Sequence, residues 1–140
     1  MIVNAQDLIL GRLASYVAKR LLEGEEVVVV NAELAVITGR KEFIVSKYKK
    51  RIERRTLSNP KKGPKFPKTP DGIVKRAIRG MLPYKKPKGR KAFKKLKVFS
   101  DVPSQYEKFD EIEIESIKGK TSRFLRIAKL SEALGYRVME

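Results

Sequence analysis

The sequence contains no cysteine and no histidine among its 140 residues. A chain without these residues cannot form disulfides or the usual zinc sites, and it has neither a Cys nucleophile nor a His general base. Catalytic and metal sites built from Cys or His are therefore excluded, and we expect the chain to use no metal and no cofactor. Asn and Gln are scarce, with three and two residues, whereas Lys and Glu are plentiful, which is typical of heat-adapted proteins.

Long apolar runs are also missing. No apolar segment is long enough to span a bilayer, and we find neither a lipid-anchor signal nor an amphipathic helix with an extended apolar face. The first four residues hold no basic region ahead of an apolar stretch, so we expect no signal peptide and no membrane partner. The 41% of apolar residues in 16.0 kDa is enough for one domain with a core.

Acidic residues are nearly absent from residues 40–97. This block holds 23 Lys or Arg and only three acids (Glu42, Glu53 and Asp71), a formal charge of +20, whereas the other 82 residues have a balance of −3. The net charge of +17 and the pI near 10.2 thus come from one segment. The positive charges of such a block repel one another unless a polyanion neutralises them, and the commonest such polyanion is a nucleic-acid backbone. A solvated basic surface is the alternative.

The first 31 residues follow a strand–helix–strand pattern. Ile2 and Val3 form a short apolar start, residues 10–21 carry apolar side chains at helical spacing, and Gly24 is placed to end that helix. Residues 26–31 include four consecutive valines, which predict a strand buried on both faces. This pattern favours the α/β class with a parallel sheet covered by helices.

The glycine patterns of nucleotide-binding enzymes do not follow these strands. Both the Walker loop and the dinucleotide fingerprint are missing, which weighs against an enzyme on a nucleotide-binding fold. Thr38, Gly39, Arg40 and Lys41 stand between a short extended piece (35–38) and a helix, so they form either a phosphate site or an ordinary glycine turn. The residues leave this choice open.

The basic block alternates helices and loops. The pattern predicts a helix from Gly39 to about Arg55 with a core face and a cationic face. A loop rich in Pro, Gly and Lys follows over 58–70, and Thr69 and Pro70 begin a second helix that ends before Pro83, with Met81 and Leu82 in the core. A second basic loop over 84–91 leads into a short helix over 90–96 and a strand over 97–99.

We interpret this block as an RNA-binding surface. Phe66 and Tyr84 lie in the loops and could stack on bases, whereas Tyr48, Phe93 and Phe99 have core patterns. The candidate RNA-binding residues are Arg40, Lys41, Lys47, Lys50, Arg51, Arg54, Arg55, Lys61, Lys62, Lys65, Lys68, Lys75, Arg76, Arg79, Lys85, Lys86, Lys88, Arg90, Lys91 and Lys94.

The C-terminal third has a different composition. Residues 107–115 hold five carboxylates, and 111–115 alternate as a half-exposed strand does. A carboxylate pair for metal or acid–base chemistry is possible here, but a solvated strand face or a contact for a basic neighbour is favoured. Residues 123–127 fit strand or helix, and 131–134 predict a short helix ended by Gly135.

Several segments, taken in order, resemble the universal large-subunit ribosomal protein thirteen family in its archaeal form. The resemblance covers about residues 2–99, with a weaker match over 130–135. The segments are Leu10-Gly11-Arg12-Leu13-Ala14-Ser15, Val30-Asn31-Ala32-Glu33, Ile37-Thr38-Gly39-Arg40, Pro70-Asp71-Gly72-Ile73, Arg79-Gly80-Met81-Leu82-Pro83, Gly89-Arg90-Lys91-Ala92-Phe93 and Leu96-Lys97-Val98.

The resemblance implies a three-layer α/β/α fold around a mostly parallel four-stranded sheet. It implies a non-catalytic, cytoplasmic constituent of the large ribosomal subunit that binds large-subunit rRNA beside neighbouring ribosomal proteins, with no small-molecule substrate. Lys41, Arg79 and Arg90 lie within the matching motifs. We expect one domain over 1–140, with a family core over 1–99 and a C-terminal extension over 100–140 packed on it. An RNA-binding regulator of translation outside the ribosome is the alternative.

Overall fold

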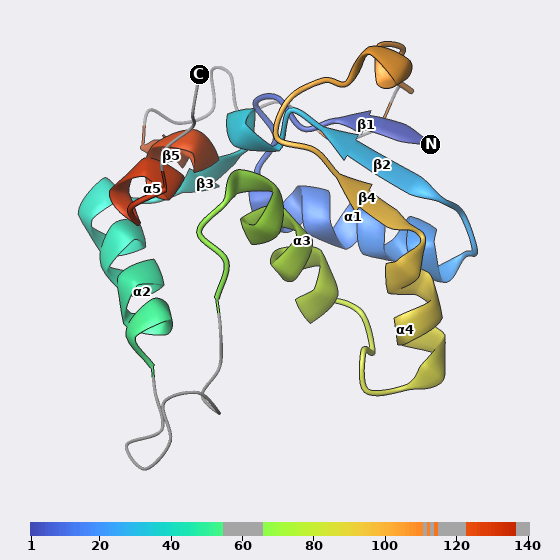
Figure 1. The fold of residues 1–140 in the computed structure, drawn as a ribbon, viewed down its shortest axis with the longest axis horizontal. Helices are drawn as coiled ribbons and strands as arrows, with labels where there is room; N and C mark the ends of the chain where they lie inside the picture. The colour runs from blue at the N-terminus through green and yellow to red at the C-terminus, as the bar shows by residue number, and fades with distance from the viewer. Residues whose placement is uncertain (55–65, 111, 113, 115–122, 137–140) are drawn as a thin grey trace.

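A computed structural model describes residues 1–54, 66–110, 112, 114 and 123–136 (Figure 1). Strand β1 (Ile2–Asn4), helix α1 (Leu10–Leu22) and strand β2 (Val27–Val30) form the predicted strand–helix–strand unit, and β4 (Leu96–Val98) pairs with the other edge of β2. Both pairings are parallel. The α/β class is therefore confirmed.

The sheet is divided in a way that the sequence did not predict. Strand β3 (Val36–Thr38) does not extend the parallel sheet but pairs antiparallel with β5 (Phe124–Arg126), so the described residues form a three-stranded and a two-stranded sheet. After β1 the chain turns at Asp7, whose φ is +61°, and β3 meets the following segment through an isolated parallel bridge between Ile9 and Val36. The described residues do not confirm the predicted single four-stranded sheet, because β3 finds its ladder partner in the C-terminal third.

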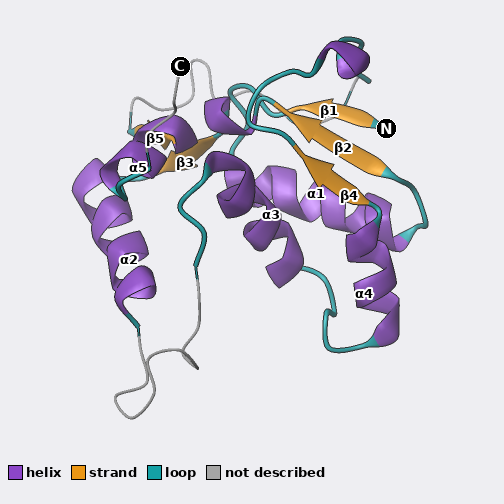
Figure 2. Cartoon of the chain, viewed as in Figure 1, coloured by secondary structure: helices purple, strands orange, loops and turns teal. Residues whose placement is uncertain are grey.

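Three helices lie on the same side of the parallel sheet: α1, α3 (Pro70–Gly80) and α4 (Pro87–Lys94) (Figures 1 and 2). Helix α2 (Lys41–Glu53) and helix α5 (Ile127–Ala133) pack instead beside the β3–β5 pair. The predicted stripe of α1 is buried in full, from Leu10 to Leu21, against α3 and the sheet. Each fully buried Leu, Ile or Val side chain contributes roughly 1.5–3 kcal/mol to folding.

Helix α3 begins as predicted. The Gly72 N–H donates to Thr69 Oγ1 at 3.3 Å, and Pro70 occupies the first turn, where its missing N–H costs nothing. The end of this helix differs from the prediction. Leu82 is buried, but Met81 is 45% exposed, because the helix ends at Gly80 and the chain turns before Pro83.

Helix α4 begins earlier than predicted, at Pro87 rather than Arg90, and it ends at Lys94. The basic loop expected over 84–91 is therefore helical from residue 87 onwards. Two sequence signals explain this. Pro87 is suited to the first turn of a helix, and Gly89 lets the helix approach the preceding turn so closely that a Cβ there would stand 2.1 Å from the Pro83 carbonyl oxygen. The expected strand after it is β4, shifted by one residue.

The C-terminal third is joined to the body at several points. Residues 124–126 are strand and α5 then starts at Ile127, which resolves the ambiguity of 123–127 and makes the helix longer than predicted. Buried Ser131 donates to the Lys68 carbonyl. Asp110 binds the edge of β1: its Oδ2 accepts from the Ile2 N–H at 2.7 Å, and its backbone N–H donates to the Ile2 carbonyl at 2.9 Å. The strand predicted over 111–115 lies outside the described residues, except for Ile112 and Ile114, which pack against the core.

Candidate nucleic-acid interface

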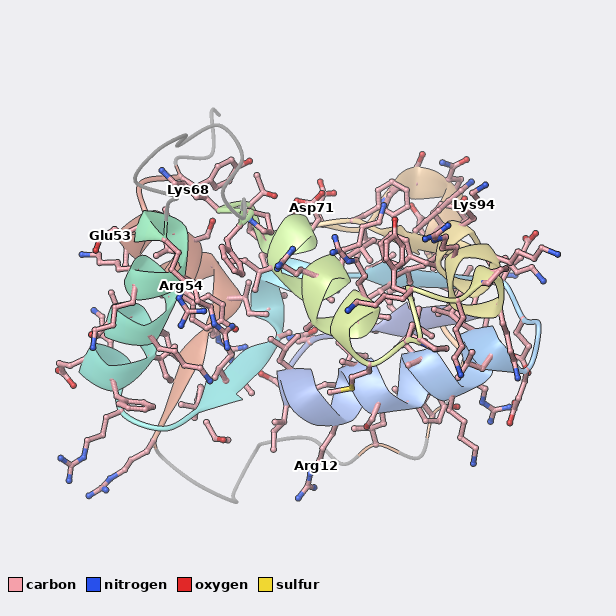
Figure 3. The ribbon with its side chains drawn as sticks, turned by 90° about the horizontal axis from the view of Figure 1, so that it is seen from below. Arg12, Glu53, Arg54, Lys68, Asp71 and Lys94 are labelled. Carbon is pink, nitrogen blue, oxygen red and sulfur yellow. The ribbon has the colours of Figure 1, made fainter. Side chains whose placement is uncertain are left out.

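Helix α2 separates its apolar and cationic side chains as predicted. Ile44 is buried, whereas Lys47, Lys50 and Arg54 are exposed and Arg51 is half-buried. Figure 3 shows α2 beside α3 with side chains rich in nitrogen between and around them. The helix therefore presents a row of cations because its core-facing positions recur at 3–4-residue spacing and leave the other positions to solvent.

Arginines and aromatic rings meet between α2 and α3. The Arg51 guanidinium lies 5.1 Å from the centroid of the Tyr48 ring, and the Arg76 guanidinium lies 4.2 Å from that of Phe66. The four side chains line a cavity of about 50 Å³. Ring faces attract cations, so the rings hold these guanidinium groups in place.

The charges at this point repel one another. Burial lowers the pKa of Arg76, and the positive charges of Arg79 and Arg51 lower it further. Burial raises the pKa of Tyr48, an effect that Arg51 opposes, so the phenol stays protonated and neutral at physiological pH. Arg76, whose charged state is disfavoured by burial and by its two arginine neighbours, gains from an anionic partner.

A second cluster lies between α3 and α4. Arg79 stands 4.7 Å from the Tyr84 ring and Lys75 stands 5.3 Å from the Phe93 ring. Tyr84 and Phe93 meet edge to face, with centroids 5.6 Å apart. Because Lys75 and Arg79 are four residues apart on α3, one face of the helix carries both.

Arg90 is placed by the turn that precedes α4. Its Nε donates to the Tyr84 carbonyl oxygen at 3.1 Å, while its side chain remains exposed. A guanidinium has five N–H donors, so this bond leaves others for a further ligand. Arg90 thus both braces the turn that carries Tyr84 and contributes charge to the surface.

The chain does not neutralise this charge within the residues that the structure describes. No Lys or Arg of 40–54 or 66–97 lies within 4.0 Å of a carboxylate in this part of the chain. The ion pairs of the described residues are elsewhere: Arg20 with Glu23 and Glu25, Arg126 with Asp7, and Lys129 with Glu132.

Most predicted site residues are accessible. Those half-buried are Arg51 and Arg76. The exposed ones are Arg40, Lys41, Lys47, Lys50, Arg54, Lys68, Lys75, Arg79, Lys85, Lys86, Lys88, Arg90, Lys91 and Lys94. Arg55, Lys61, Lys62 and Lys65 lie outside the described residues. Three lysines of the block were not among the predicted site residues. Lys49 is exposed on α2, but the helical spacing used for the prediction omitted it. The other two are Lys97 and Lys95, whose Nζ donates to the Gly24 carbonyl at 3.2 Å.

The start of α2 has the geometry of a glycine turn. Gly39 has a φ of +124°, which favours glycine, and its N–H donates to the Arg123 carbonyl at 3.0 Å. The Gly39 N–H is thus used within the chain, whereas the side chains of Arg40 and Lys41 are exposed. This favours the glycine-turn interpretation for Gly39 itself; phosphate binding by the two cations stays a prediction.

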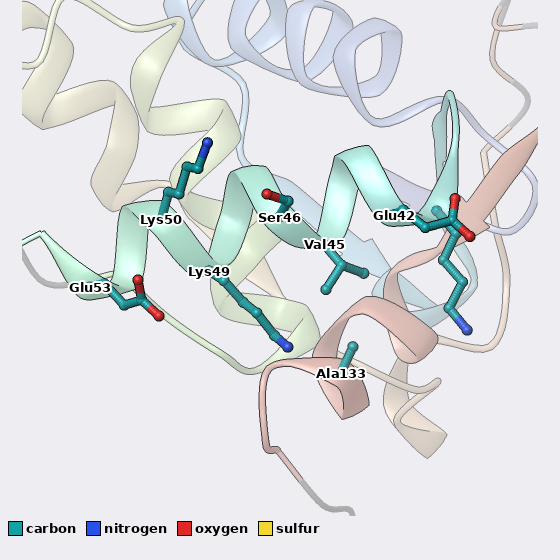
Figure 4. Close-up of a pocket in the computed structure, with 8 residues that line it drawn as sticks. Glu42, Val45, Ser46, Lys49, Lys50, Glu53 and Ala133 are labelled. Carbon is teal, nitrogen blue, oxygen red and sulfur yellow. The ribbon is translucent and has the colours of Figure 1, made fainter.

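Two grooves run along α2 and differ in charge. One, of about 590 Å³, lies towards α5 and has Val45 and Ala133 in its lining, with Lys41, Glu42, Ser46, Lys49, Lys50 and Glu53 around them (Figure 4). In this view Lys49 points towards the end of α5 and Lys50 towards the opposite side of the helix. The other groove, of about 400 Å³, is lined by Phe43, Ser46, Lys47, Lys50, Arg51 and Arg54. The first groove mixes both signs of charge, whereas the second is lined by cations and by no carboxylate of the part of the chain that the structure describes.

The described residues contain no group of three or more Asp or Glu placed to hold a metal ion. Of the acidic segment 107–115, Glu107 and Asp110 are exposed, and Glu111, Glu113 and Glu115 lie outside the described residues. None of the described helices has both the length and the apolar character needed to cross a bilayer.

Comparisons with known proteins agree on one family. The family model for ribosomal protein L13 matches residues 1–105. The chain is 50% identical to the large ribosomal subunit protein uL13 of Methanocaldococcus jannaschii, over 96% of both chains. It is 51% identical to that of Methanococcus maripaludis, over 96% of this chain and 97% of the relative, and 47% identical to that of Haloarcula marismortui, over 96% and 90%.

Proposed function

The chain belongs to the ribosomal protein L13 family, and from this premise we propose that it is a structural constituent of the large ribosomal subunit. In this role it binds large-subunit rRNA, supports subunit assembly and translation in the cytoplasm, and catalyses no reaction. The observation that carries the proposal is the similarity of nearly the whole chain to archaeal proteins named large ribosomal subunit protein uL13.

The basic face around α2, α3 and α4 is the proposed rRNA-binding surface. Its support is the set of cations that the described part of the chain leaves without carboxylate partners, together with the repulsion that lowers the pKa of Arg76. Phosphates would relieve this repulsion and release counterions. Contacts to phosphate and sugar position a protein without reading sequence, so the shape of the folded rRNA supplies most of the selectivity.

We further propose that residues 1–99 form the family core and residues 100–140 an extension of the same domain. The hydrogen bonds of Asp110 to β1 and the pairing of β5 with β3 tie the extension to the core, which supports its place in the same domain. Exposed parts of the extension are the natural place for contacts with neighbouring large-subunit proteins, because this third of the chain lacks the cationic excess of the block.

Cofractionation tests the proposal. The expected result is that the tagged protein sediments with large subunits and stays there through a moderate salt wash. Purified protein should also bind large-subunit rRNA with a steep salt dependence, close to one unit of log–log slope for each duplex phosphate neutralised, and about 0.7 on single strands. Absence from large subunits together with binding to other RNAs would overturn the ribosomal role and favour a regulator.

A further inference from the structure

Phe43 is the most exposed large apolar side chain of the described residues, at 69%. Its neighbour Ile44 is buried in the core, so α2 presents Phe43 to solvent by the same periodicity that buries Ile44. A single exposed apolar side chain needs no explanation by itself. Phe43 differs because of the side chains that surround it.

The surroundings of Phe43 are cationic. The ring lies at one end of the groove of about 400 Å³, and Lys47, Lys50, Arg51 and Arg54 follow it along the helix. Positions 43, 47, 50 and 51 recur at 3–4-residue spacing, so they share one face of α2, and Arg54, the residue directly after the helix, extends the same groove. No carboxylate of the described residues lines this groove, whereas Glu42 and Glu53 line the groove on the other side of the helix (Figure 4).

The ring of Phe43 is also free of the contacts that occupy the other aromatic rings of the basic block. Arg76 covers Phe66 at 4.2 Å, and Tyr84 contacts both Arg79 and Phe93. Within the described residues, no cation or second ring lies over Phe43. The two loop rings that could stack on bases, Phe66 and Tyr84, are therefore covered by arginines, whereas the Phe43 ring has open faces among the described residues.

We propose that Phe43 stacks on an unpaired RNA base while Lys47, Lys50 and Arg54 bind the phosphates next to that base. This inference rests on the proposed function and adds to it a defined contact with a bulge, loop or other unstacked nucleotide. Bases that leave an RNA helix are recognised by stacking on aromatic side chains, and every base offers a π-face to do so. Exposed cations one to three turns along the same helix face supply the electrostatic track for the flanking backbone. A purely apolar protein partner would have to bury these cations unpaired, at a high cost.

The absence of tryptophan from the chain permits a direct test. A Phe43→Trp variant carries a single Trp at the proposed stacking position, and a Phe109→Trp variant carries one at a matched control position, since Phe109 is 42% exposed and lies outside the basic block. The probe is the large-subunit rRNA of Methanocaldococcus jannaschii. The expected result is that this rRNA quenches the emission of the Trp at position 43 and leaves that of the control unchanged. Equal emission with and without rRNA at position 43 would overturn the proposal.

Binding measurements supply the second readout. The affinity of Phe43→Ala for the same rRNA should fall about 5- to 150-fold, the range of alanine substitutions at stacked bases. Its salt slope should equal that of the unmodified protein, because no phosphate contact is lost, whereas Lys47→Ala should lower the slope by about 0.7 for a single-strand contact. The melting temperature of Phe43→Ala should not change, since the ring contributes little to the core.

The outcomes separate this inference from the proposed function. If the unmodified protein fails to bind rRNA, the proposed function fails and this inference fails with it. If the unmodified protein binds with a steep salt slope and Phe43→Ala binds equally well, only the inference fails. If Phe43→Ala also binds rRNA normally but is lost from large subunits, the ring contacts a neighbouring protein instead, which overturns base stacking.

Discussion

Arg126 of β5 forms an ion pair with Asp7 in the turn after β1, with Nη2 and Oδ1 2.7 Å apart across 119 positions of the sequence. Asp7 is buried, with a side chain 7% exposed, and Arg126 also donates to the Leu34 carbonyl at 2.9 Å. One guanidinium thus joins the N-terminal turn, the 3₁₀ helix η1 (Ala32–Leu34) and the C-terminal third.

Arg126→Ala should therefore destabilise the protein. The change leaves the Asp7 carboxylate buried without this partner, and hydrogen bonds to charged groups are worth about 1.5–3 kcal/mol. Urea unfolding monitored by circular dichroism measures the loss. The control is Lys129→Ala, which removes the exposed pair of Lys129 with Glu132 and should cost less than about 0.5 kcal/mol. Equal midpoints for the two variants would contradict the structural role of Arg126.

Gly89→Ala should disturb the turn before α4. The added Cβ would stand 2.1 Å from the Pro83 carbonyl oxygen and 2.9 Å from the Tyr84 nitrogen, so backbone must move. Overpacking of this kind costs typically about 1–3 kcal/mol. Gly11→Ala is the matched control, because it lies in α1 with nothing within 4 Å of the new Cβ, and it should be neutral or stabilise the protein by up to about 1 kcal/mol. The melting temperature should fall for Gly89→Ala and should stay the same or rise for Gly11→Ala. Equal melting temperatures for the two variants would contradict the close approach at Gly89.

The effect of a charge reversal on rRNA binding should depend on where the residue lies on the surface. Arg79→Glu and Arg90→Glu place a negative charge among the cations of α3 and α4, so we expect each to weaken rRNA binding at least tenfold more than Lys129→Glu, which lies on α5 beside Glu132. A filter-binding series at one fixed salt concentration measures this. Similar losses for all three variants would mean that binding follows net charge and not the location of the basic face.

Salt should stabilise the free protein. The cations of α2 and α3 repel one another, and added salt screens this repulsion, so the melting temperature should rise between low and moderate ionic strength. A triple variant, Arg51→Gln with Arg76→Gln and Arg79→Gln, should show a smaller rise because it lacks the repelling groups. A melting temperature that falls with salt in the unmodified protein would mean that favourable ion pairs outweigh the repulsion.

The local structure of the chain followed from the sequence to a large extent. The buried stripe of α1, the valine strand, the Thr69 cap and the positive φ of Gly24 and Gly135 were all predicted, because each depends on residues that are close in the chain. The predictions for α4 and Met81 were wrong near helix ends, where one Pro or one turn moves a boundary by several residues.

The sequence by itself determined the class of the protein: a small α/β chain whose positive charge is concentrated in 58 residues and which has no Cys or His for catalytic or metal sites. Composition and short-range periodicity suffice for these conclusions. Only the tertiary structure decided that β3 pairs with β5, that Asp7 meets Arg126, that Arg76 lies over Phe66, and that Phe43 keeps open faces at the end of a cationic groove. The physical reason is that such contacts join segments far apart in the chain, and a periodic pattern says which face of an element is buried but not which distant segment covers it.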